Sequence, residues 1–560
     1  MEAFIKILRV YFQAFFFLVF IASFFAALVY PNAYHVDARW FLRVNPLPGI
    51  LSFIASRSII VEYAVLVLAV TAVTAVFGRL FCGFFCPLGS IIDVVDKYIF
   101  TTLRLAARRP PLYLQKLKYV LLFIIIIVAL SGALFPLFMD PLSIITRIFT
   151  VFIYPLPAIF DNLLRPLLGT LGAGNRLHLP LFYGTLGIGG LFLVTIAGSF
   201  WDRRFWCQYV CPSGAFFGII SRFAPFHRRA HLASPTTVRC TGCKACVKVC
   251  PTRAIGEKLS TTSTAECILC GKCIGIRDSC SAFSFSTTKF LMGEAVGPDI
   301  GRRQILTGAV AGTLLLPVFK ADAFSRRDNT GRLIRPPGSV PEAVFNGRCL
   351  ACGQCMKVCP TNTLQPCTLG DGFSRLSTPK LVPRIGGCEE KCYSCGQVCP
   401  TNAIRKLPYE EKRFVKIGTA VIDRHRCLAW EQNKECLVCD EVCPYNAITP
   451  RYVETTRGRF KVPIVDSDLC IGCGMCEQQC PIFDTAAIVV YKFGENRRLT
   501  GPFTTDVQKQ TILEKRKASD SSLNTDLGSG APKKPTTAGE GGVEPAQKPG
   551  EGAPSSGFSF

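Results

Sequence analysis

Histidine is scarce in this chain of 560 residues: only five are present, and no two lie in its long apolar segments as the ligand pair of a haem b would. No C-x2-C-H motif occurs, which argues against covalently bound c-type haem. No G-x-G-x-x-G follows a predicted strand, so neither a nicotinamide nor a flavin domain is indicated. Nucleophile triads, paired catalytic carboxylates and nucleic-acid-binding patterns are not indicated either. What the chain has in excess is basic, apolar and cysteine residues.

Lysine and arginine number 63 against 39 acidic residues, which gives a formal net charge of +24. The mean hydropathy is positive, which is unusual for a soluble protein. Together these features are typical of a membrane protein with basic inner loops, rather than of a protein that binds nucleic acid.

Four apolar segments are each long enough to cross the hydrocarbon core, which takes about 20 helical residues. They cover residues 10–30, 59–81, 119–139 and 179–200. The first is too long for a secretory signal and three more follow it, so we expect a membrane anchor. A further apolar stretch is interrupted by Pro155 and Pro157, and we expect it to be interfacial or re-entrant. Basic residues near the segment ends place the amino terminus, and the ends of the second and fourth segments, in the cytoplasm.

The grouping of the 29 cysteines indicates their role. Disulfide frameworks belong to small secreted domains with irregular spacing. Here 24 cysteines form six quartets, four more form two short pairs, and only Cys367 stands alone. The repeated form is C-x2-C-x2-C-x3-C-P, in which three thiolates hold one iron–sulfur cubane and the fourth ligates the other cluster of a pair. Zinc usually takes C-x2-C pairs separated by a longer gap, so the pattern predicts 4Fe–4S clusters.

Two quartets lie in a segment of soluble character, residues 224–295. Because the fourth cysteine of each quartet ligates the other cluster of the pair (the crossed rule), Cys280 completes the first cluster and Cys250 the second. The second quartet departs from the pattern, because six residues precede Cys280 and Ser281 replaces the proline. The eight predicted ligands are Cys240, Cys243, Cys246, Cys250, Cys267, Cys270, Cys273 and Cys280.

Four quartets, each ending in Cys-Pro, form the largest cysteine-rich block. The middle two are irregular, with a three-residue gap in "CEEKC" and a longer insertion in "CLAWEQNKEC". We expect four clusters there and six in the chain, while the pairing of neighbouring or nested quartets stays open. The sixteen predicted ligands are Cys349, Cys352, Cys355, Cys359, Cys388, Cys392, Cys395, Cys399, Cys427, Cys436, Cys439, Cys443, Cys470, Cys473, Cys476 and Cys480.

The remaining four cysteines form a repeated motif, C-x3-C-P-x-G. "FCGFFCPLGS" holds Cys82 and Cys86, and "WCQYVCPSGA" holds Cys207 and Cys211, each directly after an apolar segment of the same orientation. A spacing of four places two thiols on one helical face. The two pairs could supply one additional iron–sulfur or metal centre, and the duplication favours this over local structural cysteines at helix ends.

A twin arginine, Arg302 and Arg303, precedes a short apolar run at residues 305–319. Twin-arginine signals export folded proteins, and a four-cluster domain must acquire its iron before it leaves the cytoplasm. With the arginines inside, the run would be a fifth span and the four-quartet block would lie outside. An ordinary anchor gives the same topology, whereas a run too short to span would keep everything cytoplasmic.

The predicted fold is therefore mixed: an α-helical membrane domain of four or five spans with small α+β ferredoxin domains of the bacterial type. A tail rich in Pro, Gly, Ser, Lys and Glu should be disordered. The predicted divisions are a membrane domain at 1–223, a two-cluster ferredoxin domain at 224–295, the twin-arginine segment and anchor at 296–330, a four-cluster ferredoxin domain at 331–500 and the disordered tail at 501–560.

With these motifs, the first half resembles the membrane ferredoxin NapH of periplasmic nitrate reductase systems and MauN of methylamine utilisation. Its C-x3-C-P pairs are also similar to those of NosR- and CcoG-type proteins. The second half, with its twin arginine, apolar run and four quartets, resembles NapG or MauM. The chain is thus similar to a NapH–NapG-type fusion over residues 1–491, although the twin arginine lies in mid-chain rather than at the amino terminus.

In such families the ferredoxins accept electrons from quinol and pass them to a periplasmic oxidoreductase. The resemblance therefore implies an electron-transfer protein of the bacterial inner membrane, with its N-terminus inside, its C-terminal ferredoxin domain periplasmic, and the quinone pool and a redox protein as partners. No catalytic residue is predicted, and membership of a quinol-oxidising enzyme complex stays open. The alternatives are a maturation or reactivation reductase for another metalloenzyme, or a subunit of an energy-converting membrane redox complex.

Overall fold

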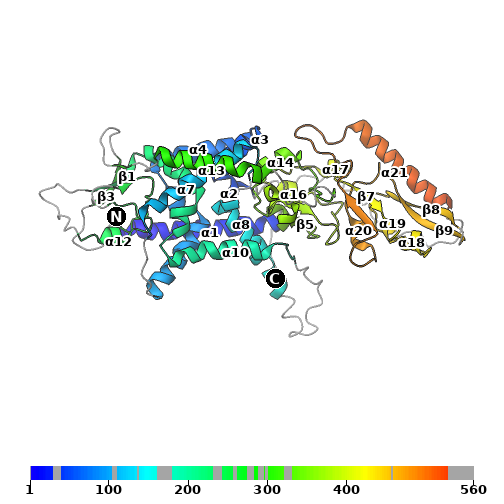
Figure 1. The fold of residues 1–560 in the computed structure, drawn as a ribbon, viewed down its shortest axis with the longest axis horizontal. Coiled ribbons are helices and arrows are strands. Elements are labelled where there is room, and N and C mark those ends of the chain that lie inside the picture. Colours follow the sequence, from blue (N-terminus) through cyan, green and yellow to red (C-terminus); the bar gives the residue numbers. More distant parts are fainter. Residues whose placement is uncertain are drawn as a thin grey trace, which may run out of the picture.

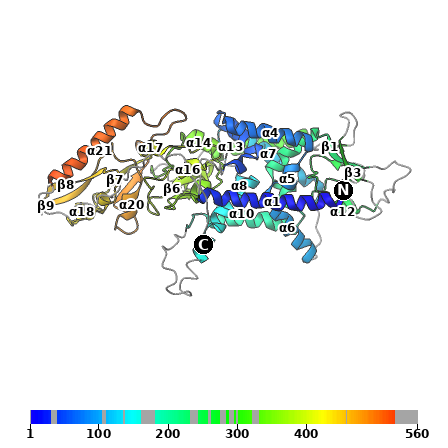
Figure 2. The same ribbon diagram turned by 180° about the vertical axis from the view of Figure 1, so that it is seen from behind.

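The computed structural model describes residues 2–29, 39–103, 110–134, 138–160, 180–230, 243–256, 262–273, 283–287, 295–296, 301–320, 331–455 and 458–526. The molecule is elongated, with apolar helices in the middle and cysteine-rich parts at both ends (Figures 1 and 2). Helix α1 (Glu2–Val29) runs along the long axis through the helical part. The other helices there are α2 (Trp40–Arg43), α3 (Pro46–Ser56), α4 (Val61–Phe77), α5 (Leu80–Phe84), α6 (Pro87–Lys97), α7 (Leu117–Leu130), α8 (Pro141–Ile148), α10 (Thr185–Ala197) and α11 (Pro212–Ile220).

Within the described residues, three helical stretches are long and apolar enough to cross a membrane: Ile7–Ala27, Leu112–Leu130 and Pro141–Phe160. The first coincides largely with an expected span, and the second overlaps the expected span 119–139 over residues 119–130. Two other expected spans form shorter apolar helices, α4 and α10, because α4 ends at Gly78 and α10 begins only after Gly184. Both glycines have positive φ, a conformation that glycine adopts without strain.

The third stretch contains the prolines that were expected to make it interfacial or re-entrant, and it is helical over most of its length. Helix α8 continues into a π-helical turn, η4 (Phe149–Ile153), and the chain then resumes a helical turn at Pro155. The Pro155 carbonyl accepts a hydrogen bond of 3.0 Å from the N–H of Ile159. Proline is tolerated in the first turn of a helix, where its missing N–H has no partner to lose. The stretch is mostly buried inside the helical part.

Helix α13 (Arg302–Lys320), which contains the twin arginine and the apolar run, packs along α7. Two glycines allow the close approach. A Cβ added to Gly308 would lie 2.7 Å from Cβ of Phe123, and one added to Gly312 would lie 2.9 Å from Cβ of Ile127. Gly308 and Gly312 form a G-x3-G motif, which brings membrane helices together. Gly308 faces Phe123, and Gly312, four residues later, faces Ile127, which is also four residues later. The helices α13 and α7 therefore run in the same direction.

The smaller cysteine-rich part lies at the end of the molecule where α1 begins (Figure 1). Its described residues form one short helix, α12 (Ala245–Val249), and two small sheets. Strand β1 (Phe226–Ala230) pairs antiparallel with β3 (Phe283–Thr287), and β2 (Thr262–Ser263) pairs parallel with β4 (Ala295–Val296).

The larger cysteine-rich part lies at the opposite end (Figures 1 and 2). Three antiparallel two-stranded sheets support its loops: β5 (Leu364–Pro366) with β6 (Pro379–Leu381), β7 (Thr419–Ile422) with β10 (Ile488–Tyr491), and β8 (Ile448–Thr455) with β9 (Gly458–Val465). Its short helices are α14 (Glu342–Arg348), α15 (Gln354–Lys357), α16 (Ser394–Gln397), α17 (Tyr409–Lys412), α18 (Leu428–Glu431), α19 (Val438–Glu441) and α20 (Met475–Gln479).

This larger part is docked on the helices through buried polar contacts. Nζ of Lys357 donates to the Phe24 carbonyl near the end of α1, at 2.6 Å. Nε of Arg43 donates to the Pro400 carbonyl at 2.8 Å. Lys357 and Arg43 are both nearly inaccessible to solvent. The two cysteine-rich parts are therefore held at opposite ends of the helical part.

The expected disordered tail differs from the structure over part of its length. Residues Asp506–Asp526 form helix α21, which packs on the larger cysteine-rich part. Its Arg516 lies over the rings of Phe414 and Tyr445, with the guanidinium carbon 5.4 and 4.9 Å from their centroids. These cation–π contacts stabilise a polar helix that the composition of the segment does not predict. Residues 527–560 lie outside the described residues.

Candidate cluster sites

In the larger part, the structure brings three cysteines of one quartet together with the last cysteine of the neighbouring quartet. One cavity is lined by Cys349, Cys352, Cys355 and Cys399. The reciprocal set also lies together, since Cys359 and Cys392 are within electrostatic range of Cys388, and Cys388 of Cys395. The first two quartets of the block therefore exchange their fourth cysteines.

The last two quartets are crossed in the same way. One cavity is lined by Cys443, Cys470, Cys473 and Cys476, and another by Cys427, Cys436, Cys439 and Cys480. Neighbouring quartets, rather than nested ones, thus share sites. The backbone N–H of Cys388 donates to the Cys473 carbonyl at 2.7 Å, which joins the two pairs of sites.

In the smaller part, one cavity is lined by Cys250, Cys267, Cys270 and Cys273, as the crossed rule predicts for Cys250. Cys243 and Cys246 are described, the first exposed and the second buried. Cys240 and Cys280, the other two predicted ligands of the reciprocal site, lie outside the described residues.

The loops between the cysteines have a conformation suited to surrounding a cluster. In C-x2-C turns the residue before the second cysteine has positive φ at Leu269, Ala351 and Gly472. The final cysteine of a quartet then accepts a backbone N–H bond: Ala254 donates to Sγ of Cys250 at 3.3 Å. The same occurs at 3.4 Å for Cys399, Cys443 and Cys480. Hydrogen bonds to ligand sulfurs are one of the means by which proteins tune cluster potentials.

These sites fit a cluster better than a single metal ion. Among the described residues, no three His, Cys, Asp or Glu side chains are placed to hold one ion. Instead, each of the four cavities is lined by four cysteines, the number of thiolates that holds a 4Fe–4S cluster. Burial also raises the pKa of the Cys352 and Cys388 thiols to about 11, so their thiolates need the positive charge of a metal centre.

Arg147 supports the same conclusion for the first cavity. It is 1 % exposed, forms no ion pair with a described residue, and its Nη1 has no hydrogen-bond partner there. Its other nitrogens donate to the carbonyls of Ser143 and Phe138. Cys352, Asp140 and Cys349 lie within electrostatic range of Arg147. A buried cation without an ion pair is costly, and an anionic cluster on these cysteines would supply counter-charge beside that of Asp140.

The structure also brings Cys82, Cys86, Cys207 and Cys211 together, all within electrostatic range of one another. The expectation that each pair lies on one helical face is wrong in detail. Cys82 lies in α5, but Cys86 is the N-cap of α6; Cys207 lies in the π-helix η7 (Trp206–Val210), and Cys211 is the N-cap of α11. The proline after each second cysteine ends the preceding helix and begins a new one. Two helix N-termini therefore point at the site, which favours thiolates.

This four-cysteine site lies deep in the helical part. The ring of Phe85, next to Cys86, contacts the ring of Phe16 with centroids 4.1 Å apart. Phe16 lies near the middle of the apolar stretch Ile7–Ala27 of α1. On the side of the smaller part, Gly83 packs against the Ile268 carbonyl: a Cβ added to Gly83 would lie only 2.3 Å from that oxygen. The four-cysteine site therefore adjoins the cavity lined by Cys267.

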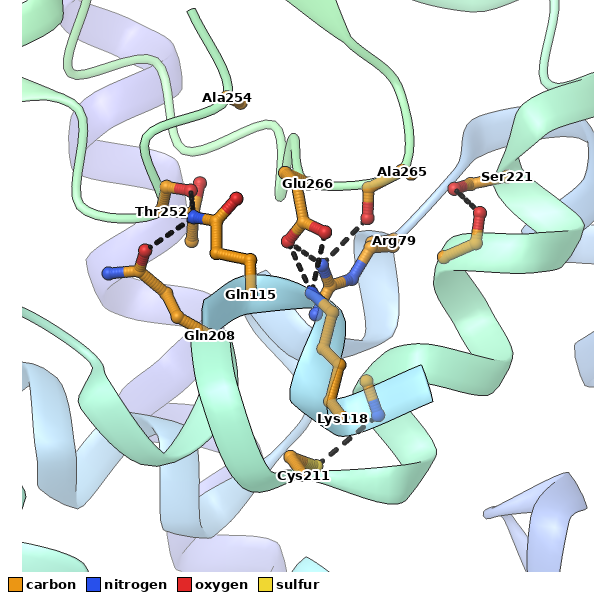
Figure 3. A network of polar contacts seen from close by, with 12 residues as sticks. Arg79, Gln115, Lys118, Gln208, Cys211, Ser221, Thr252, Ala254, Ala265 and Glu266 are labelled. Carbon is orange, nitrogen blue, oxygen red and sulfur yellow. Dashed lines mark hydrogen bonds and ion pairs between the residues drawn. The ribbon is translucent and has the colours of Figure 1, made fainter. Parts of the chain in front are cut away.

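A buried ion network joins these two sites (Figure 3). Glu266, beside Cys267, accepts from Nζ of Lys118 at 2.5 Å and from Nη1 of Arg79 at 2.9 Å. Arg79 also donates to the Ala265 carbonyl at 2.7 Å. Arg204, which also lies beside the four-cysteine site, donates twice to Asp93, at 2.8 Å each.

A second buried network lies toward the larger part. Oδ1 of Asp140 accepts from Nδ2 of Asn45 at 2.5 Å and from the hydroxyl of Ser213 at 2.8 Å. Tyr63 donates to the Asn45 carbonyl at 3.1 Å. Since Ser213 follows Cys211 by two residues, this network extends the four-cysteine site toward the other end.

Sequence reasoning about cysteines alone missed Arg79 and Arg204. A signal for both was present, because each stands three residues before the first cysteine of a C-x3-C-P-x-G motif. Cys367, which was expected to be incidental, lies in none of the four cavities described.

Family models of iron–sulfur proteins match the chain at several places. A 4Fe–4S dicluster domain matches residues 434–483, and 4Fe–4S binding domains match residues 61–109, 183–231, 237–256 and 343–365. The chain is therefore a ferredoxin-type protein with 4Fe–4S binding domains in both halves. No solved structure matches it.

Curated relatives agree with this class. The chain is 36% identical to the methylamine utilization ferredoxin-type protein MauM of Methylorubrum extorquens, over 34% of this chain and 88% of the relative. It is 35% identical to the ferredoxin-type protein NapG of Escherichia coli, over 36% of this chain and 89% of the relative. It is 29% identical to MauN of Paracoccus denitrificans, over 35% of this chain but only 56% of the relative. The chain belongs to the NapG/MauM family of ferredoxin-type proteins, as a fusion with a NapH/MauN-like part.

Proposed function

We propose that this chain is a membrane-bound 4Fe–4S electron-transfer protein that relays electrons between the quinol pool and an oxidoreductase on the outer side of the membrane. Bound clusters would supply one-electron chemistry. The observation that carries the proposal is the series of cysteine sites along the molecule: crossed sites at both ends, with a four-cysteine site between them.

The proposed ligands are the 24 cysteines of the six quartets, crossed between neighbours as described. Cys82, Cys86, Cys207 and Cys211 are proposed to hold one further centre. Support for the latter comes from the convergence of the four cysteines, the burial of Cys86 and Cys211, and the two helix N-termini directed at them.

The depth of the four-cysteine site makes the series continuous. Phe16 of α1 marks the level of Cys86, and Phe24 contacts Lys357, two residues after Cys355. Eight helical residues separate these levels, about 12 Å at 1.5 Å per residue. The aromatic rings of Phe20, Phe24 and Phe149 fill this interval. The intermediate site also lies at a depth where a lipid-soluble quinol diffuses, which supports quinol as the redox partner in the membrane.

The parallel packing of α13 on α7 supports an outer location for the larger part. If residue 116 lies on the cytoplasmic side, as the basic loop before α7 predicts, α7 runs outward. Helix α13 would then run outward with it, leaving Arg302 and Arg303 inside and the larger part outside. The proposed domain division, with a membrane domain between a cytoplasmic and a periplasmic ferredoxin domain, follows from this.

Two measurements test the proposal. A reporter that is active only outside the cytoplasm, fused after Phe560, should be active, and protease added to spheroplasts should cleave the larger part. In membranes, a reduced quinol analogue should then reduce the iron–sulfur signals of the protein, as followed by electron paramagnetic resonance. An inactive reporter would refute the outer location, and failure of any quinol to reduce the centres would refute the quinol relay.

The sites themselves are tested by iron and sulfide analysis. A Cys82→Ser variant should lose one centre, whereas Cys367→Ser should lose none, because Cys367, although buried, lies in none of the four cavities and its electrostatic neighbours are Arg335, Asp371 and Lys380. Equal iron content in the wild type and Cys82→Ser would remove the central site from the proposal.

A further inference from the structure

The repeat around the four-cysteine site extends beyond its cysteines. The segments "RLFCGFFCPLG" and "RFWCQYVCPSG" both read R-x2-C-x3-C-P-x-G. Their arginines, Arg79 and Arg204, are 1 % and 0 % exposed. Two arginines at the same place in a duplicated motif, both fully buried, require a common explanation.

Each arginine reaches the repeat that does not contain it. A Cβ added to Gly214 would lie 2.9 Å from Nη2 of Arg79, and one added to Gly89 would lie 3.5 Å from Nη2 of Arg204. Arg204 also donates to the Cys82 carbonyl at 3.1 Å. The last glycine of each motif therefore leaves room for the arginine of the other repeat. The two guanidinium groups lie beside the same group of cysteines.

The charges beside the site do not cancel. Two buried cations share each of two carboxylates. The groups are Arg79 and Lys118 with Glu266, and Arg9 and Arg204 with Asp93. Asp96 also lies within electrostatic range of Arg204, and Lys272 within range of Asp93, so positive charge remains in excess. Cys82 and Cys211 lie within electrostatic range of Arg79, and Cys207 within range of Arg204.

We infer that Arg79 and Arg204 are positioning residues that together set the reduction potential of the centre held by Cys82, Cys86, Cys207 and Cys211. The inference rests on the proposed function, which assigns a centre to these cysteines. A centre with four thiolate ligands gains a negative charge on reduction, and buried positive charge favours that gain. The crossed contacts also fix the two repeats relative to each other, so the charge is held at a constant distance from the sulfurs.

The test is a potentiometric titration of the full-length protein in detergent, followed by electron paramagnetic resonance. Arg79→Gln and Arg204→Gln should each shift the reduction equilibrium of this centre at least tenfold toward the oxidised form, which is about 59 mV for one electron. Lysine variants keep the charge and should shift it less. Asp93→Asn should shift it the other way. Arg203→Gln is the matched control: Arg203 precedes Arg204, but its guanidinium carbon lies over the Phe100 ring, 5.3 Å from the centroid.

A centre that assembles in both glutamine variants with an unchanged potential would overturn the inference, as would a shift of equal size in Arg203→Gln. If the signal is lost in the glutamine and the lysine variants alike, the arginines serve assembly and do not set the potential. The proposed function fails separately: in that case Cys82→Ser would retain every signal of the wild type, whatever the arginine variants do.

Discussion

Glu266 offers the sharpest test of how the smaller cysteine-rich part is held on the helices. Its carboxylate is the only acidic group that the described structure places in ion-pair contact with both Arg79 and Lys118, and all three side chains are at least nine-tenths buried. A Glu266→Gln substitution keeps the size of the side chain but leaves two buried cations without a counter-charge. Breaking a buried pair in this way costs about 3–5 kcal/mol.

Even the lower figure should be easily measured, because every 1.4 kcal/mol is about a tenfold change in an equilibrium constant. Local opening of this part should therefore increase more than 100-fold. The readout is hydrogen exchange at the amides of Glu266 and Cys267 in the detergent-solubilised protein, both of which donate to the Ser263 carbonyl. Asp468→Asn is the control, since its pair with Lys515 is solvent-exposed and should contribute little. Unchanged protection in Glu266→Gln would refute the reasoning.

Three further predictions concern other parts of the molecule. Gly312→Leu should separate α13 from α7 and expose α13 to protease, whereas Gly190→Leu should not, because nothing lies within 4 Å of an added Cβ at Gly190. Cys352→Ser and Cys399→Ser should abolish the same paramagnetic signal, since crossed quartets share one cavity; loss of two different signals would contradict the crossing. Burial raises the pKa of Asp96 to about 6, so folding favours its protonated form and stability should decrease as the pH rises from about 4 to 6. Asp96→Asn should remove that decrease, as measured by thermal unfolding at several pH values, and a pH profile identical to wild type would refute it.

The cysteine pattern predicted which residues gather, because a C-x2-C-x2-C loop brings its thiols together by local geometry alone. It did not predict the pairing of the last four quartets, since the position of each fourth cysteine depends on contacts such as the bond from Cys388 to Cys473, far apart in sequence. Likewise, helical periodicity misled at Cys86, where the following proline starts a new helix and redirects the chain.

Composition was similarly informative only in part. It indicated membrane helices, but not that α13 would pack along α7 through Gly308 and Gly312, which depends on shape and not on hydropathy. It predicted disorder for the tail, whereas α21 is held by Arg516 and its two aromatic partners. Buried arginines and carboxylates were the hardest to anticipate, because each is tolerated only when its partner, often more than a hundred residues away, is in place.

The docking of the larger part on the helices has a consequence for how the fusion assembles. Both partners of that interface, including Lys357 and the carbonyl of Phe24, belong to one polypeptide. Association of the two parts is therefore intramolecular. The effective concentration of one part at the other is set by the intervening chain and not by the expression level. An interface too weak to join two separate proteins at cellular abundance can then stay closed nearly all the time. The one-to-one stoichiometry of the two halves is guaranteed by translation itself.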